Sequence, residues 1–175
     1  MGNAYTYNMP AGIPGVVNRV GGRAPDIEAQ IMDPTNPLPL YGLAGQIDAT
    51  SQYFRALAAG DTAIYGFLVR PYPEQPTTAS GFSGSVTLGT AAVPPQFQTA
   101  IDVLKSGYMT VILYAATAAA KGGVVYVRKQ NAGAGEVVGG AEAAADGGNT
   151  ITLDAKSYFM GPADANNFVE LAFNI

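Results

Sequence analysis

The hydrophobic pattern after residue 47 is that of short β-strands separated by turn residues. Apolar runs of β-branched and aromatic residues stop at Gly or Pro, and later runs alternate apolar with polar positions, as half-buried strands do. Several short strands of this kind predict an all-β domain, built as a small β-barrel or a sandwich of short antiparallel strands. We expect strands at residues 63–69, 81–88, 108–114, 124–128, 150–154 and 168–175.

Two further stretches fit more than one element. Residues 51–59 carry apolar side chains at helical spacing, with Ser51 as a possible N-cap and Gly60 after the end. Residues 96–105 also fit a helix, but Ile101 and Val103 alternate with the charged residue between them, which favours a strand. Neither choice changes the predicted fold class.

The first 46 residues combine many Pro and Gly residues with apolar side chains. Pro removes a backbone donor and Gly costs backbone entropy, so long regular elements are disfavoured here. A disordered tail would be poorer in apolar residues. We therefore predict an extended N-terminal arm over residues 1–46 that lies on a surface, either its own body or a neighbour, followed by a β-rich body over residues 47–175.

Residues 131–149 form a low-complexity stretch of Gly and Ala with a few acidic residues. Such a stretch offers little to bury, so we expect a mobile surface loop or the tip of a long hairpin. A lid over a binding site is the alternative interpretation.

The amino-acid composition excludes most kinds of catalytic site. The chain has no Cys, no His and no Trp, which excludes disulfides, thiolate nucleophiles, imidazole bases and the common zinc sites. Nine basic against thirteen acidic residues give a net charge of −4, a poor match for nucleic acid. Carboxylates remain, but Asp26, Glu28 and Asp61 have no spacing that pairs them, and a solvated strand edge explains the first two. We predict no enzyme activity, no cofactor and no metal.

The charged fraction is only 13%, so we expect much of the surface to contact other protein. The N-terminus has no basic region followed by an apolar run, and no apolar stretch is long enough to span a bilayer. We expect the chain not to associate with a membrane and to stay in the cytoplasm, where it is made.

Several segments, taken in order, resemble the structural cement, or capsid decoration, proteins of tailed bacteriophages. They cover most of the chain, although each is a loose pattern rather than a diagnostic motif. The segments are MPAGIPGVVNR at 9–19, YGFLVRPYP at 65–73, VLKSGYMTV at 103–111, GGVVYVR at 122–128, FMGPAD at 159–164 and VELAFN at 169–174.

The resemblance implies a structural protein of the virion that binds the outer surface of an expanded phage head and bridges subunits of the major capsid protein. It also implies a small β-barrel or β-tulip body, a homotrimer and no catalysis. The chain would be made in the cytoplasm of the bacterial host. Under this hypothesis the arm supplies apolar anchors, and its arginines meet an acidic capsid surface. The candidate contact residues are Tyr5, Tyr7, Ile13, Val16, Val17, Arg19 and Arg23.

Three other functions stay open at this point. A minor head or tail protein would differ from a cement protein in its copy number in the virion. A carbohydrate-binding β-sandwich would need a cluster of exposed Tyr residues, and a carboxylate hydrolase would need two acids facing each other in a cleft.

Overall fold

The computed structural model describes residues 12–18, 24–71 and 100–175. Within these ranges the chain is built almost wholly from short strands joined by turns, with one 3₁₀ turn, η1, at Gly147–Asn149. The strands are β1 (Asp26–Ile31), β2 (Ala44–Ile47), β3 (Phe54–Ala56), β4 (Gly66–Leu68), β5 (Ala100–Tyr114), β6 (Tyr126–Arg128), β7 (Ala141–Glu142), β8 (Thr150–Thr152), β9 (Tyr158–Phe159) and β10 (Phe168–Phe173).

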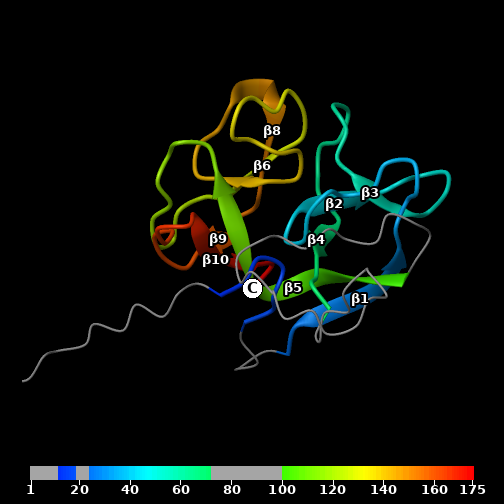
Figure 1. The fold of residues 1–175 in the computed structure, drawn as a ribbon, viewed down its shortest axis with the longest axis horizontal. Helices are drawn as coiled ribbons and strands as arrows, with labels where there is room; N and C mark the ends of the chain where they lie inside the picture. Colours follow the sequence, from blue (N-terminus) through cyan, green and yellow to red (C-terminus); the bar gives the residue numbers. More distant parts are fainter. Residues whose placement is uncertain (1–11, 19–23, 72–99) are drawn as a thin grey trace, which may run out of the picture.

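Strand β5, with 15 residues, organises the whole sheet. Its first half pairs antiparallel with β1 along one edge and with β4 along the other, and both neighbours meet it at Val103 and Leu104. Its second half pairs antiparallel with β10, and its last two residues pair with the short parallel strand β7. Figure 1 shows β5 running from the β1–β4 half of the molecule into the half that holds β6 to β10.

The sheet is open and almost entirely antiparallel. Its main path runs β3-β2-β4-β5-β7-β6-β8, and β1, β9 and β10 join it through side pairings. The path begins and ends at different strands, so the sheet does not close on itself. The predicted all-β class is confirmed, and the open sheet is consistent with a sandwich-like fold rather than a closed barrel.

Two hydrophobic cores lie along β5. We call the first the larger core and the second the smaller core, and each is built from strands far apart in sequence. The larger core comprises Ala44, Leu57, Phe67, Val69, Leu104, Met109, Val111, Leu113, Ala119, Val125, Val127, Ala141, Ile151, Leu153, Phe159, Val169, Leu171 and Phe173. The smaller core comprises Met32, Leu38, Tyr41, Leu43, Phe54, Leu68, Ile101 and Val103.

Most strand predictions are confirmed at shorter length. Strands β4, β6, β8 and β10 lie inside four predicted stretches, and the expected strand at 108–114 is the second half of β5. The strand interpretation of 96–105 is confirmed from residue 100 onward. The helical reading of 51–59 is wrong, because Phe54–Ala56 is strand β3, whose Phe54 is fully buried in the smaller core. The expected strand at 81–88 lies outside the described residues.

Residues 24–46 are part of the folded body. Strand β1 pairs with β5 over its whole length, and Met32, Leu38 and Leu43 are almost fully buried in the smaller core. The division drawn from the sequence at residues 46 and 47 falls inside β2.

The Gly/Ala segment (residues 131–149) is irregular, as expected, but its middle is buried. Ala141 and Glu142 form β7, inserted between β5 and β6. The Gly139 N–H donates to the Arg128 carbonyl at 2.7 Å, and the Gly139 carbonyl accepts from the Ala44 N–H at 2.8 Å. This part of the segment is therefore packed into the sheet, and the expectation of a fully exposed loop does not hold for it.

Candidate interaction surface

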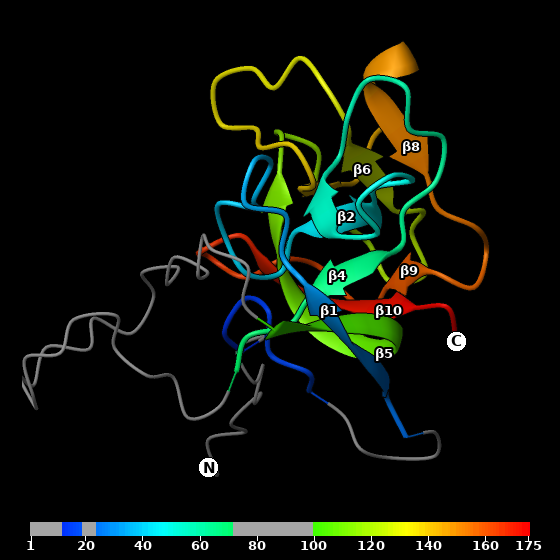
Figure 2. The same ribbon diagram turned by 90° about the vertical axis from the view of Figure 1, so that its right-hand side faces the viewer.

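Strand β1 lies at the surface, and five of its six residues are exposed. It pairs with β5, and directly after it Met32 forms a bridge with Phe54 of β3, whose carbonyl accepts a hydrogen bond from the Asp33 N–H at 2.8 Å. Figure 2 shows β1 on the side of the molecule that faces the viewer, in front of β5. An exposed strand edge is a template for pairing with another chain.

An apolar stripe follows one face of β1. Ile27 and Ile31 are 41% and 44% exposed, and Ala29 lies between them on the same face because side chains alternate along a strand. A shallow groove runs beside the stripe, lined by Ala29, Ile31, Tyr53 and Ala100 among others. Natural edge strands are usually guarded by charged side chains, Pro or a bulge, and β1 carries the charged residues Asp26 and Glu28 but no Lys or Pro. A shift in register at Asp26 and Ile27 is the one irregularity in its pairing with β5.

The opposite face of β1 is polar and tied to the body. The Tyr65 hydroxyl donates a hydrogen bond to the Glu28 carboxylate and accepts one from the Gln30 side-chain amide at 3.3 Å. Lys105 Nζ donates to the Tyr65 carbonyl at 2.7 Å and lies over the Tyr65 ring. Burial of the ammonium lowers the pKa of Lys105, although the nearby acids Glu28 and Asp26 oppose this. These contacts fix the orientation of β1 and leave its apolar face outward.

The residues predicted to contact the capsid divide into two groups. Residues 15–18 lie along β5: the Gly15 N–H donates to the Thr110 carbonyl at 2.8 Å, and Val17 forms a bridge with Met109. Val17 packs against the larger core, and Val16 is half-buried, so both are partly used by the chain's own fold. Ile13 is 37% exposed and is the most accessible of the three. Tyr5, Tyr7, Arg19 and Arg23 lie outside the described residues.

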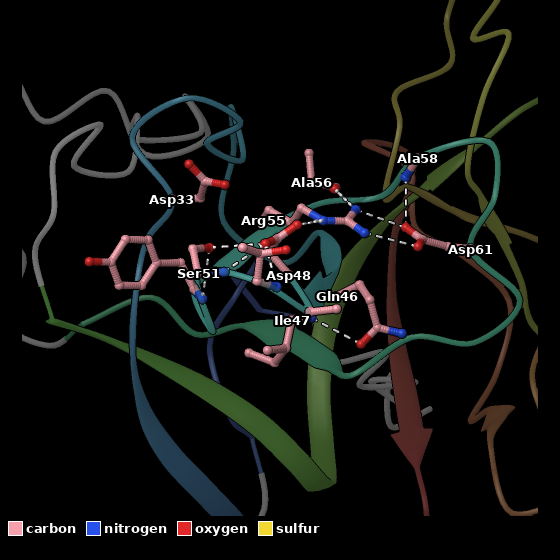
Figure 3. A network of polar contacts seen from close by, with 12 residues as sticks. Asp33, Gln46, Ile47, Asp48, Ser51, Arg55, Ala56, Ala58 and Asp61 are labelled. Atoms are coloured by element: carbon pink, nitrogen blue, oxygen red, sulfur yellow. Dashed lines mark hydrogen bonds and ion pairs between the residues drawn. The ribbon is translucent and has the colours of Figure 1, made fainter.

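Polar networks hold the loops in place. Arg55 of β3 binds Asp61 through two hydrogen bonds of 2.9 and 3.0 Å and also donates to the Ala56 carbonyl (Figure 3). Burial by itself raises the pKa of Asp61, but the hydrogen bonds from Arg55 and the Ala58 N–H hold that pKa below its ordinary value. Lys129 adds a bond to the Asp61 carbonyl at 3.0 Å, which links this loop to the end of β6.

A second network is centred on a buried ion pair. Arg128 at the end of β6 is 1% exposed and binds Glu142 of β7 through two bonds of 2.7 and 2.9 Å. Its guanidinium also contacts Glu136 at 2.8 Å and Asp146 at 2.5 Å. All three carboxylates come from the Gly/Ala segment, so Arg128 fastens that segment to the sheet. The Arg128–Glu142 pair is buried, whereas the Asp146 side chain is about half exposed.

No catalytic constellation is present among the described residues. Asp26 and Glu28 lie exposed on β1, whereas Asp61 pairs with Arg55, so the three candidate acids do not face one another in a cleft. In residues 12–18, 24–71 and 100–175 no three potential metal ligands come together. The same ranges hold no helix long and apolar enough to cross a membrane.

The exposed stripe on β1 was missed at the sequence level. Its signal is the strict alternation in DIEAQI, but the flanking Gly and Pro residues favoured an arm over a strand. Only pairing with β5 shows that the segment is extended and that its apolar side faces away from the body.

Comparison with known proteins identifies the family. Residues 2–173 match the family model described as the XM1 gp53 minor capsid protein. The fold is similar to a chain in the solved structure titled "The capsid of Myoviridae Phage XM1", with a TM-score of 0.67 and 18% sequence identity over 99% of this chain and 97% of the other. A comparison with curated proteins finds no match. The predicted relationship to tailed-phage capsid proteins is confirmed, and the chain belongs to the XM1 gp53 minor capsid protein family.

Proposed function

We propose that this chain is a cement protein that binds the outer surface of a tailed-phage head as a homotrimer and bridges subunits of the major capsid protein. The observation that carries the proposal is the family match over residues 2–173. The chain has few charged residues, and its surface exposes the apolar side chains of Ile13, Ile27 and Ile31. Both features support binding of this surface to other proteins. Binding of this kind requires no catalysis and no cofactor.

Cement proteins stabilise a shell by binding linkage. A ligand that binds the assembled lattice but not its dissociated subunits stabilises the lattice by about 2.7 kcal/mol per site at one hundred times its dissociation constant. Because many copies bind one shell, a modest affinity at each site is enough.

Co-sedimentation with expanded, undecorated heads tests the proposal. We expect saturable binding at a fixed ratio to the capsid protein, together with a higher temperature of head disruption. We also expect Ile13→Asp to weaken binding by about tenfold, as loss of a buried anchor does. Val124→Asp is the matched control, since Val124 is 48% exposed and forms a bridge with Tyr158 of β9 rather than lying along β5. An absence of binding to heads of the chain's own phage would overturn the cement function.

A minor head component present in few copies is the second candidate, because the family description itself reads minor capsid protein. The copy number in purified virions separates the two functions. A number close to that of the capsid protein supports cement, and a few copies per particle supports the minor component.

A further inference from the structure

An acidic side chain lies beside the apolar stripe of β1. Asp102 of β5 is opposite Ala29 in the pairing of the two strands, so both side chains point to the same outward face. Asp102 is exposed, and its carboxylate has no hydrogen bond or ion pair to any residue in the described ranges. We call this surface the β1 face, and it consists of Ile27, Ala29, Ile31, Ala100 and Asp102.

The complementary chemistry lies elsewhere on the same chain. The turn after β5, residues 115–122, has one charged residue, Lys121, which is exposed. The Lys121 ammonium also has no bonded partner among the described residues. We call residues 115–122 the alanine turn, because its other exposed side chains include those of Ala115, Ala116, Ala118 and Ala120. The β1 face is thus an apolar surface with one acid, and the alanine turn is an apolar surface with one base.

The body of the protein holds the alanine turn in place. Ala119 is buried in the larger core, and the Gly122 N–H donates to the Phe159 carbonyl of β9 at 2.8 Å. The exposed methyl groups around Lys121 leave no long neighbouring side chain to block the approach of another surface. A contact made by a surface that is already ordered loses little conformational entropy.

We propose that the β1 face of one copy of this chain binds the alanine turn of a second copy. Asp102 pairs with Lys121, and the isoleucines of the stripe pack against the exposed alanines. Figure 1 shows the alanine turn at the left of the molecule and β1 at the lower right, so one copy does not make this contact with itself. A contact between two different surfaces joins copies head to tail, and it closes into a ring when the rotation between copies permits.

The contact is small, so its strength depends on closure of the ring. Each surface buries far less than the roughly 800 Å² per partner of a standard interface, and a single contact is therefore weak. In a ring the last contact forms within an assembly that is already linked, where the effective concentration is high. The inference deepens the proposed homotrimer and rests on it only for the number of copies in the ring.

Exchange of the two charges tests the contact in the free, full-length protein, with association measured by sedimentation velocity at high concentration. We expect Asp102→Lys and Lys121→Asp each to weaken association by about tenfold, because each places like charges opposite each other. A variant with both changes should associate as the parent protein does, since the ion pair is reversed and restored.

Lys156 provides the matched control. It is exposed, its ammonium has no bonded partner among the described residues, and it lies outside the alanine turn. Lys156→Asp alone should leave association unchanged. Asp102→Lys combined with Lys156→Asp has the same net charge as the exchanged variant but does not re-form the pair, so its association should stay weak.

Cross-linking gives a second measurement. A carbodiimide joins carboxylates to amines that are in direct contact, and we expect mass spectrometry to find Asp102 linked to Lys121 in the covalent oligomer. An exchanged variant that associates no better than the single variants would overturn the pairing, and so would equal recovery with Lys156→Asp. A parent protein that stays monomeric at its highest soluble concentration would overturn the contact. Co-sedimentation with heads is measured separately, so failure of head binding and failure of this contact are distinguishable.

Discussion

Arg128 has almost no exposed surface, and its partner Glu142 is equally buried. Removing one member of a buried ion pair leaves the other charge without compensation, at a cost of about 3–5 kcal/mol. We expect Arg128→Met to lower the free energy of unfolding by that amount in urea denaturation. Adding Glu142→Met should recover part of the loss, because an apolar pair replaces an isolated charge. A double variant less stable than Arg128→Met would contradict this account.

The carboxylates of the polar networks make stability depend on acid pH. The Asp33 pKa is lowered mainly by the Thr35 hydroxyl, and the Asp146 pKa mainly by Arg128. Hydrogen bonds from Arg55 and Ala58 lower the pKa of Asp61 despite its burial. Because the folded pKa values lie below the ordinary value of 3.8, the unfolded chain binds protons first as pH falls.

The stabilisation is therefore complete well above pH 4 and is lost as pH falls through the folded values. We expect the urea midpoint to be steady from pH 7 to 5 and to drop steeply below 4. Asp61→Asn removes one of the titrating groups, so its midpoint at pH 7 should be lower and its loss on acidification smaller. If the urea midpoint of Asp61→Asn depended on pH as that of the parent protein does, Asp61 would not contribute to the loss of stability at acid pH.

At the scale of elements, the Gly/Ala segment is held by close backbone packing. A Cβ added at Gly140 would lie 2.4 Å from Cδ2 of Tyr114 and 2.8 Å from the Val137 carbonyl oxygen. At Gly148, in the same segment, a Cβ would meet nothing within 4 Å. The small residues of this stretch therefore have different physical roles on either side of β7.

We expect Gly140→Ala to destabilise the protein by about 1–3 kcal/mol, as overpacking of a tight contact does. Gly148→Ala should change the unfolding free energy by less than about 0.5 kcal/mol. Chemical denaturation of the two variants beside the parent protein measures the difference. Equal unfolding free energies for the two variants would show that the backbone around Gly140 can shift to accept a Cβ. Close packing at Gly140 would then contribute little to stability.

At the scale of the whole molecule, we expect the residues before position 47 to be needed for folding. Removing residues 1–46 deletes β1, most of β2 and half of the smaller core, including Met32, Leu38 and Leu43. We expect the truncated chain to lack a cooperative unfolding transition, which circular dichroism against temperature will show. A truncated chain that unfolds cooperatively near the parent temperature would establish 47–175 as an independent body.

The local pattern of apolar and polar residues was enough to predict some strands and not others. Strands β4, β8 and β10 were predictable because their apolar residues alternate or cluster between breakers. Strand β1 was not, because pairing with β5 overrides the Pro and Gly residues around it. Burial of Arg128 was equally hidden, since its three carboxylates follow it at irregular intervals in a segment of low complexity.

The amino-acid sequence by itself determined the all-β class, the absence of thiol and imidazole chemistry, and the relationship to phage capsid proteins. These depend on composition, on period-two alternation and on the order of segments, all of which are local or additive properties of the chain. Tertiary structure alone decided which strand became the centre of the sheet and which carboxylates surround the buried Arg128 guanidinium. Those outcomes depend on contacts between residues far apart in sequence, such as Ile27 with Leu104 and Arg128 with Glu142.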